Sequence, residues 1–231
     1  MPAARELLLD AAFAALGSRP WSGVRMVDVA AAAGVSRQTL YNEFGSKDGL
    51  ARALVRRETE AFLAGVVRAL AGPGPGADAG ERCAAGALWI LRTARVNPLV
   101  RAALTGCRGD RVPAAAAPAD PTRRVPPGSA AARATPTPGG LADGVRDRVV
   151  EAVTAGTAGA RGPARGAGGG AAGPAGDAGR PVGGVPWACE MAVRLTLSYV
   201  VAPVGPDDEA AADVARLVRA LVGDGRGGGF T

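Results

Sequence analysis

We expect an all-α protein with an N-terminal three-helix domain and a larger helical domain behind it, and three observations predict this fold. Apolar residues recur at helical spacing along much of the 231-residue chain, and no segment shows the convincing alternation of a half-buried strand. Hydrophobic residues make up 48% of the chain, which is enough to bury a core. The 35 glycines and 18 prolines are numerous, so part of the chain should be linker.

The N-terminal domain, expected over 1–50, should hold three helices and the start of a fourth. One face of the first helix is formed by apolar residues at i, i+4 and i+7, which are Leu9, Phe13 and Leu16. Ser36 is suited to cap the third helix, because its hydroxyl can accept a hydrogen bond from a backbone N–H of the first turn. The first helix should end near Gly17. Two short helices should follow over 26–33 and about 37–43, and a long connecting helix over 46–71.

A second helical domain should occupy 72–222, followed by a flexible tail over 223–231. Val145, Val149 and Val153, at i, i+4 and i+8, illustrate the periodicity that predicts its helices. Two segments within it, 106–139 and 156–184, are rich in Gly, Ala, Pro and Arg, a composition that cannot repay the entropy of ordering by burial. The expected helices cover 79–96, 98–104, 141–155, 187–202 and 207–222.

Histidine is absent, and its absence argues against several classes of enzyme. A Ser–His–Asp triad, a His-ligated zinc and imidazole acid–base chemistry all require it. Cys83, Cys107 and Cys189 form no C-x-x-C pair, and the glycine run at 166–173 follows no strand, so we expect no metal site, cofactor or phosphate loop. Cys107 lies beside Arg108, a cationic neighbour that could activate a thiol for redox sensing, although buried inert thiols are the commoner outcome.

The charge of the chain permits an anionic partner without identifying one. There are 27 basic and 21 acidic residues, a net charge of +6 that suits nucleic acid or a lipid surface. All but one of the basic residues are arginines, however, which is also typical of a chain encoded by a high-GC genome. The chain shows no signal-peptide pattern and no run of about 18 uncharged apolar residues, so we expect a soluble cytoplasmic protein.

The most specific pattern lies in residues 27–44. Two short helices meet at Gly34-Val35-Ser36, where glycine allows a tight turn and the small Ala30 lets the helices cross closely. This is the spacing of a helix-turn-helix, in which the second helix enters the major groove of DNA. The residues that we assign to its core are Leu9, Phe13, Val29, Ala30, Val35, Leu40, Phe44 and Leu50.

Residues 5–54 resemble the DNA-binding domain of the TetR family of transcriptional regulators. The family's Ala-Gly-Val-Ser, Thr-Leu-Tyr, Phe, Lys and Leu pattern corresponds here to Ala33–Ser36, Thr39–Tyr41, Phe44, Lys47 and Leu50. Family members often cap the second helix with threonine, whereas this chain has Arg25, which could itself reach the DNA backbone. The resemblance implies a sequence-specific regulator, expected to be a ligand-responsive repressor that binds a palindromic operator as a homodimer.

The third helix carries side chains suited to DNA. Arg37 can donate two hydrogen bonds to guanine, and the amides of Gln38 and Asn42 can pair with adenine. The hydroxyls of Ser36, Thr39 and Tyr41 suit phosphate oxygens, as does Lys47 at a helix N-terminus, and the resemblance places the tyrosine and the lysine on phosphate. Thr39 and Tyr41 could equally pack or cap, and Glu43 should face away or accept from cytosine. The expected DNA-binding residues are Arg25, Ser36, Arg37, Gln38, Thr39, Tyr41, Asn42 and Lys47.

By the same resemblance, the domain after residue 72 should sense a ligand and dimerise through its last two helices. Met191, Leu195 and Tyr199 give the first of those helices an apolar stripe, and the second carries Val214, Leu217, Val218 and Leu221. The domain could form a pocket for a small apolar or amphipathic ligand, although residues that only pack a core would show the same pattern. The alternative is a DNA-binding protein with a degenerate sensor domain and no ligand response. The candidate pocket residues are Trp89, Ile90, Leu91, Leu99 and Leu104.

Overall fold

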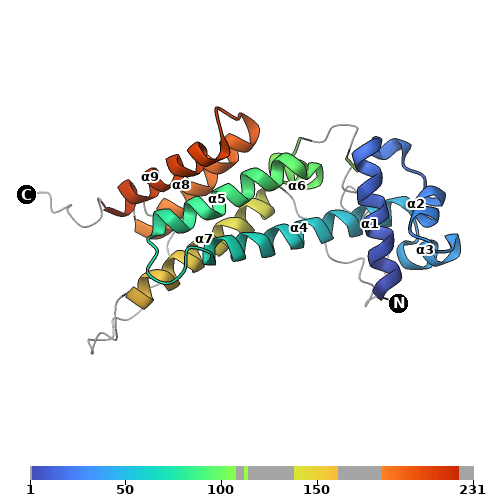
Figure 1. The fold of residues 1–231 in the computed structure, drawn as a ribbon, viewed down its shortest axis with the longest axis horizontal. Helices are drawn as coiled ribbons and strands as arrows, with labels where there is room; N and C mark the ends of the chain where they lie inside the picture. Colours follow the sequence, from blue (N-terminus) through green and yellow to red (C-terminus); the bar gives the residue numbers. More distant parts are fainter. Residues whose placement is uncertain (1, 108–111, 114–137, 161–183, 224–231) are drawn as a thin grey trace, which may run out of the picture. The chain divides into compact units, whose positions relative to one another are not determined.

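The computed structural model describes residues 2–107, 112–113, 138–160 and 184–223, and within these ranges the regular secondary structure is helical (Figure 1). Most of the two low-complexity segments lies outside the described residues. Their edges do not, because α7 extends into both of them and α8 begins at Gly184. The helices are α1 (Pro2–Ser18), η1 (Trp21–Gly23), α2 (Met26–Ala32), α3 (Arg37–Phe44), α4 (Lys47–Ala71), α5 (Ala79–Val96), α6 (Pro98–Thr105), α7 (Pro138–Ala160), α8 (Gly184–Val201) and α9 (Asp207–Gly223).

The chain divides into two compact units that do not follow its order. Unit 1 comprises Met1–Phe62 and Asn97–Leu141, and unit 2 comprises Leu63–Val96 and Ala142–Thr231. The sequence predicted an N-terminal domain over 1–50, a connecting helix over 46–71 and a second domain over 72–222 that includes α6. The two compact units divide the chain differently, because α4 passes from one unit to the other within its length and α6 belongs to unit 1.

Two features of α6 explain its place in unit 1. The side chain of Asn97 caps the helix by accepting hydrogen bonds from the N–H groups of Leu99 and Val100. Its amide donates to Glu58 Oε2 of α4 over 2.7 Å, and Leu99 lies in the same apolar core as the buried residues of α1 to α4. Apart from the cap, the contacts that fix α6 join side chains far apart in the sequence, for which the local pattern gives no signal.

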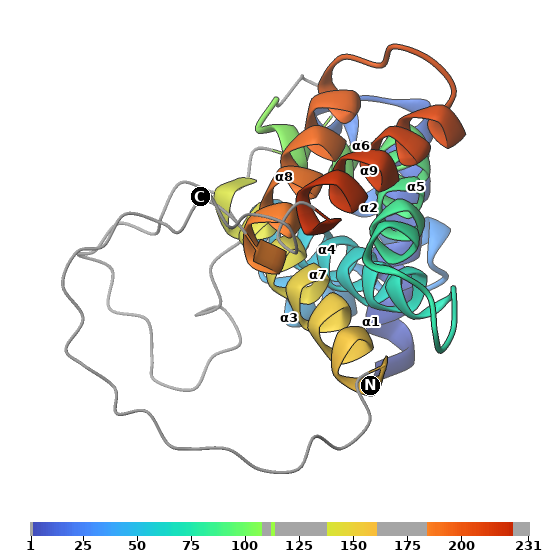
Figure 2. The same ribbon diagram turned by 90° about the vertical axis from the view of Figure 1, so that its left-hand side faces the viewer.

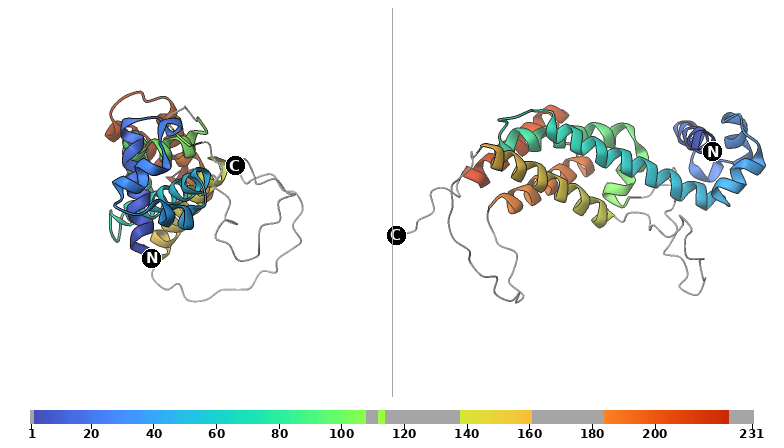
Figure 3. Two further views of the ribbon diagram at one scale, coloured as in Figure 1. Left: turned by 90° about the vertical axis from the view of Figure 1, so that its right-hand side faces the viewer. Right: turned by 90° about the horizontal axis from the view of Figure 1, so that it is seen from below.

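Unit 1 packs α1, α2, α3 and the first part of α4 around one core (Figure 3). Of the eight predicted core residues, five are buried, and Phe13, Val35 and Phe44 are partly buried against the same cluster. Burial of Leu40 on the inner face of α3 leaves the opposite face of that helix for solvent. On α4, Ala61 is exposed, whereas its neighbour Phe62 is buried.

In unit 2, α5, α8 and α9 pack against one another (Figures 1 and 2). The three valines predicted for α7 are all buried. A close approach of α4 and α5 depends on Gly65, because a Cβ there would overlap the indole of Trp89. The acidic first turn of α9 is held by α5, since Asp207 accepts from Arg95 and Asp208 accepts from Arg92 at 2.8–3.0 Å.

The apolar stripe predicted for α8 is not the face that unit 2 buries. Met191, Leu195 and Tyr199 are only partly buried, whereas an adjacent face is covered. The buried residues of α8 are Ala188, Cys189, Ala192, Val193, Thr196 and Val200. None of the helices in the described ranges combines the length and hydropathy needed to cross a bilayer.

Candidate nucleic-acid interface

A tight turn sets α3 against α2. Gly34 adopts φ +65°, a left-handed conformation that side chains rarely adopt, and the next N–H, that of Val35, donates to the carbonyl of Ala30 over 3.0 Å. Ser36 is then extended, with φ −71° and ψ 151°, as an N-cap residue must be. The turn therefore follows from the glycine and the serine that the sequence places there.

The hydroxyl of Ser36 caps α3 as predicted. Its Oγ accepts from the N–H of Thr39 over 3.0 Å and lies 2.8 Å from Thr39 Oγ1. One of the two hydroxyls donates to the other, so a single hydroxyl proton of this pair remains for an outside acceptor. Thr39 is thus part of the helix cap, which is the role that the sequence allowed for it as an alternative to a phosphate contact.

Four polar side chains lie on the exposed face of α3. Arg37, Gln38, Tyr41 and Asn42 are all exposed, and Tyr41, with 42% of its surface open, is among the most exposed large side chains of unit 1. Gln38 Nε2 donates to Asn42 Oδ1 over 2.8 Å. The two amides are therefore aligned one turn apart, with the Gln38 oxygen and an Asn42 N–H left for base edges.

Lys47 is held at the N-terminus of α4 rather than left mobile. Its ammonium donates to the carbonyl of Ser22 over 3.1 Å and lies 5.5 Å from the ring centroid of Trp21. One of its three N–H donors is used in this way. The remaining donors and the charge are available to a phosphate at the edge of α3.

Arg25 does not cap α2 with its side chain, which is 73% exposed. It donates instead to both oxygens of Asp28, each over 3.1 Å, and Arg19 adds a third hydrogen bond of 3.3 Å. The hydrogen bond from Arg25 holds the pKa of Asp28 below its usual range. Two guanidinium groups on one carboxylate leave a net positive charge at this edge, and such exposed ion pairs are weak enough to exchange for a phosphate.

Glu43 is directed toward α1, which agrees with the predicted alternative in which it faces away from DNA. Its carboxylate lies 3.5 Å from the guanidinium of Arg5, which also sits 4.8 Å above the ring of Phe44. This pairing offsets a negative charge that would otherwise repel phosphate. Sequence reasoning missed Arg5, because its partners lie almost 40 residues away and no local pattern links them.

The cysteines and the predicted pocket residues lie elsewhere. Cys83 and Cys189 are buried, and their mutual hydrogen bond together with burial raises the pKa of Cys83, so that thiol stays protonated; Cys107 is exposed, but Arg108 lies outside the described residues. The five pocket candidates are divided between the two units. Leu99 and Leu104 are buried in unit 1, and Leu91 is buried in unit 2, where Trp89 and Ile90 also lie.

Comparison with known proteins bears on this N-terminal arrangement. The sequence model for bacterial regulatory proteins of the tetR family matches residues 8–54, which run from α1 through the first turns of α4. Residues 8–54 form a TetR-family DNA-binding domain. The match includes the whole helix-turn-helix, and with it the exposed face of α3.

A curated relative repeats the match over the same region. The HTH-type transcriptional regulator AlkX of Mycobacterium tuberculosis is 53% identical over 53 residues, which is 23% of this chain and 25% of that protein. The matched segment thus spans only about a quarter of the relative. Its high identity is confined to the TetR domain.

Solved structures match the chain over nearly its whole length at low identity. The TetR-family repressor AlkX of a Dietzia species, implicated in biodegradation of n-alkanes, has a TM-score of 0.50 and 21% identity, with 94% of each chain covered. A TetR-family transcriptional regulator of Streptomyces coelicolor has a TM-score of 0.55 and 18% identity, covering 96% of this chain and 81% of its own. Outside the TetR domain, these similarities concern the fold.

Proposed function

We propose that the protein is a sequence-specific DNA-binding regulator, acting as a repressor through α3. The observation that carries this is the combination of a capped helix, a glycine turn and an outward polar face of Arg37, Gln38, Tyr41 and Asn42 in a TetR domain. Arginine and amide side chains on one helical face read base edges in the major groove. Ser36, Thr39, Lys47 and Arg25 then contact phosphates and fix the register.

The protein acts as a homodimer. Support comes from the partly exposed apolar stripe of α8, Met191, Leu195 and Tyr199, and from Leu217 and Leu221 of α9, which are also only partly buried in the single chain. A second copy that covers these side chains would remove apolar surface from water. A two-fold dimer presents two recognition helices about one turn of DNA apart, and its operator is an inverted repeat.

The regulator responds to a small molecule bound in unit 2, and the bound state has the lower affinity for DNA. Support comes from a cavity of about 650 Å³ in that unit, within the range of about 300–1,000 Å³ usual for small-molecule sites. A ligand can change the DNA affinity only as far as it binds the two conformations differently.

The function is tested by selecting duplexes from a random DNA library with the full-length protein. We expect enrichment of one inverted repeat with half-sites one helical turn apart, and light scattering should give the mass of a dimer. Enrichment must depend on α3, so a variant with Arg37→Ala and Gln38→Ala should select a different sequence or none. A library that stays random after repeated rounds would overturn sequence-specific binding, and a monomer mass would overturn the dimer.

A further inference from the structure

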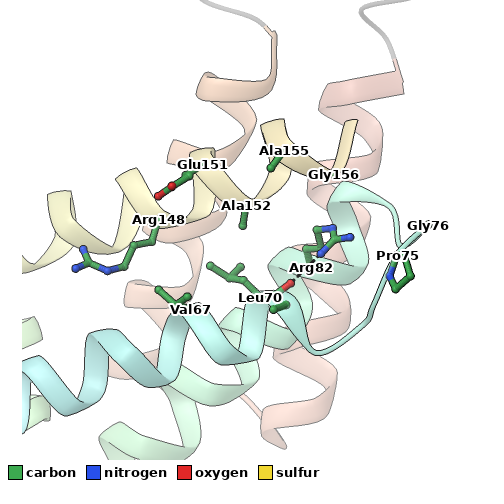
Figure 4. Close-up of a pocket in the computed structure, with 11 residues that line it drawn as sticks. Val67, Leu70, Pro75, Gly76, Arg82, Arg148, Glu151, Ala152, Ala155 and Gly156 are labelled. Atoms are coloured by element: carbon green, nitrogen blue, oxygen red, sulfur yellow. Dashed lines mark hydrogen bonds between the residues drawn. The ribbon is translucent and has the colours of Figure 1, made fainter. Parts of the chain in front are cut away.

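The cavity of unit 2 has an apolar wall on two sides. Val67, Leu70 and Ala71 of α4 form one side, and Ala152 and Ala155 of α7 form the other (Figure 4). Val67 keeps 49% of its surface exposed, although the residue before it, Val66, is fully buried. An apolar ligand in the cavity would cover this side chain and remove its surface from water. The wall alone therefore selects a hydrocarbon group.

One charged group of the cavity has an N–H without a hydrogen-bond acceptor. In Arg82 of α5, Nη1 donates a hydrogen bond to the carbonyl of Leu70 over 3.2 Å, and Nη2 donates one to the carbonyl of Gly74 over 2.7 Å. Its Nε is buried and has no acceptor. Within the described part of the chain, no carboxylate forms an ion pair with this guanidinium. A buried N–H of a cation without an acceptor is costly, and a ligand oxygen would satisfy it.

The guanidinium of Arg82 can pack closely against the end of α7 because residue 156 is a glycine. A Cβ at Gly156 would lie 2.9 Å from Arg82 Nε, so a larger side chain would displace the guanidinium or cover its free N–H. Figure 4 shows Arg82 between the end of α7 and the loop that carries Pro75 and Gly76. The geometry thus leaves the unpaired donor at the cavity wall, next to the apolar side chains.

Two further side chains that line the cavity carry opposite charges. Arg148 is partly buried and donates to the carbonyl of Gly144 over 2.7 Å, whereas Glu151 is exposed. Solvent screens an exposed carboxylate more than a partly buried guanidinium, so the Arg82 charge outweighs that of Glu151 inside the cavity. An anionic head group is therefore favoured over a cationic one.

From these observations we infer that the cavity binds a single-chain amphiphile with an anionic head group, a carboxylate or a phosphate, whose head accepts from Arg82 Nε and whose tail lies along Val67 and the α7 alanines. The inference rests on the proposed ligand response and names its ligand class. None of Trp89, Ile90 and Leu91, the unit 2 residues that the sequence suggested, lines this cavity.

The test is calorimetric titration of the full-length protein, in the absence of DNA, with probes that share one tail. Dodecanoate and dodecyl phosphate carry the anion, dodecanol is neutral, and dodecyltrimethylammonium is cationic. We expect the better of the two anions to bind about tenfold more tightly than dodecanol, because a charge-assisted hydrogen bond is gained. Which anion binds more tightly identifies the head group.

Two variants locate the binding. Arg82→Gln should lower the affinity of the preferred anion about tenfold and leave dodecanol unchanged. Ala155→Trp, at an exposed position, should fill the cavity and abolish binding of every probe without disturbing the core. Arg68→Gln and Ala64→Trp, at exposed positions of α4 outside the cavity, are the matched controls and should bind as the wild type does.

Three results would overturn the inference: no probe binds, dodecanol or the cation binds as tightly as the anions, or Ala155→Trp leaves binding intact. Because no DNA is present, these results are independent of whether the chain is a DNA-binding regulator. A separate titration of operator DNA with and without the preferred anion tests the regulation. Tight anion binding with no effect on DNA would keep the binding site and overturn the ligand response.

Discussion

Lys47 should contribute one phosphate contact per protomer, and replacing it with glutamine tests this in a way that separates backbone contacts from base reading. The ammonium is positioned by the Ser22 carbonyl and the Trp21 ring at the edge of the recognition helix. Each neutralised phosphate contributes about 0.9 to the slope of log affinity against log salt concentration, so a dimer should lose about 1.8 in slope. Between 50 and 200 mM salt, the wild type should then lose about twelvefold more affinity than Lys47→Gln.

The variant should remain folded. Lys47 makes one hydrogen bond and one cation–π contact near the surface, so its loss should lower the free energy of unfolding by about 1–2 kcal/mol. The assay is fluorescence anisotropy on operator and scrambled duplexes across the salt range, with Arg68→Gln as the charge-matched control. The reasoning is refuted if Lys47→Gln keeps the wild-type slope, or if its loss of affinity is confined to the operator.

Three further predictions concern the same unit. Arg37→Ala should cost about 1–3 kcal/mol of discrimination per contacted base pair, measured as operator affinity against scrambled affinity, because a bidentate contact to guanine is lost. Ser36→Ala should lower the free energy of unfolding by about 1 kcal/mol in urea titration, because the N–H of Thr39 loses its acceptor. Asp28→Asn should be less stable than the wild type above the unfolded pKa of about 4 and should converge with it at lower pH.

The pH dependence of the last prediction follows from the sign of the shift. Because Arg25 lowers the pKa of Asp28 in the folded state, the ionised carboxylate contributes stability above the unfolded pKa and loses it as the pH falls through the folded pKa. Parallel stability curves for wild type and Asp28→Asn would contradict this. For the other two, an equal loss on both duplexes would count against base reading by Arg37, and an unchanged urea midpoint would count against the Ser36 cap.

The helices and the turn of the TetR domain could be predicted because their signals are local. The end of α2 and both ends of α3 are set by Gly34, Ser36 and Gly45, and each of these residues lies within a few positions of the helix end that it determines. The apolar spacing of α1 likewise predicts its buried face. The exposed polar face of α3 follows from the burial of Leu40. The same locality explains why the DNA-binding residues could be named, although their roles at the DNA remain proposals.

The features that the sequence did not predict depend on contacts between distant residues. Arg5 pairs with Glu43, and Asn97 with Glu58, across 38 and 39 positions of sequence, and no periodicity encodes such partners. The extension of α7 through Gly156 was missed for another reason: its alanines favour helix, and the glycines beside them masked that propensity. The unpaired Nε of Arg82 emerges only when α4, α5 and α7 are placed together.

The central claim, that α3 reads a DNA sequence, is tested most directly by one ratio of affinities. Anisotropy at about 150 mM salt should compare the duplex enriched by selection with a scrambled duplex of the same composition. A preference of at least about a thousandfold is the result that the account predicts. Equal, salt-sensitive affinity for the two duplexes would contradict it, because binding would then come from charge alone.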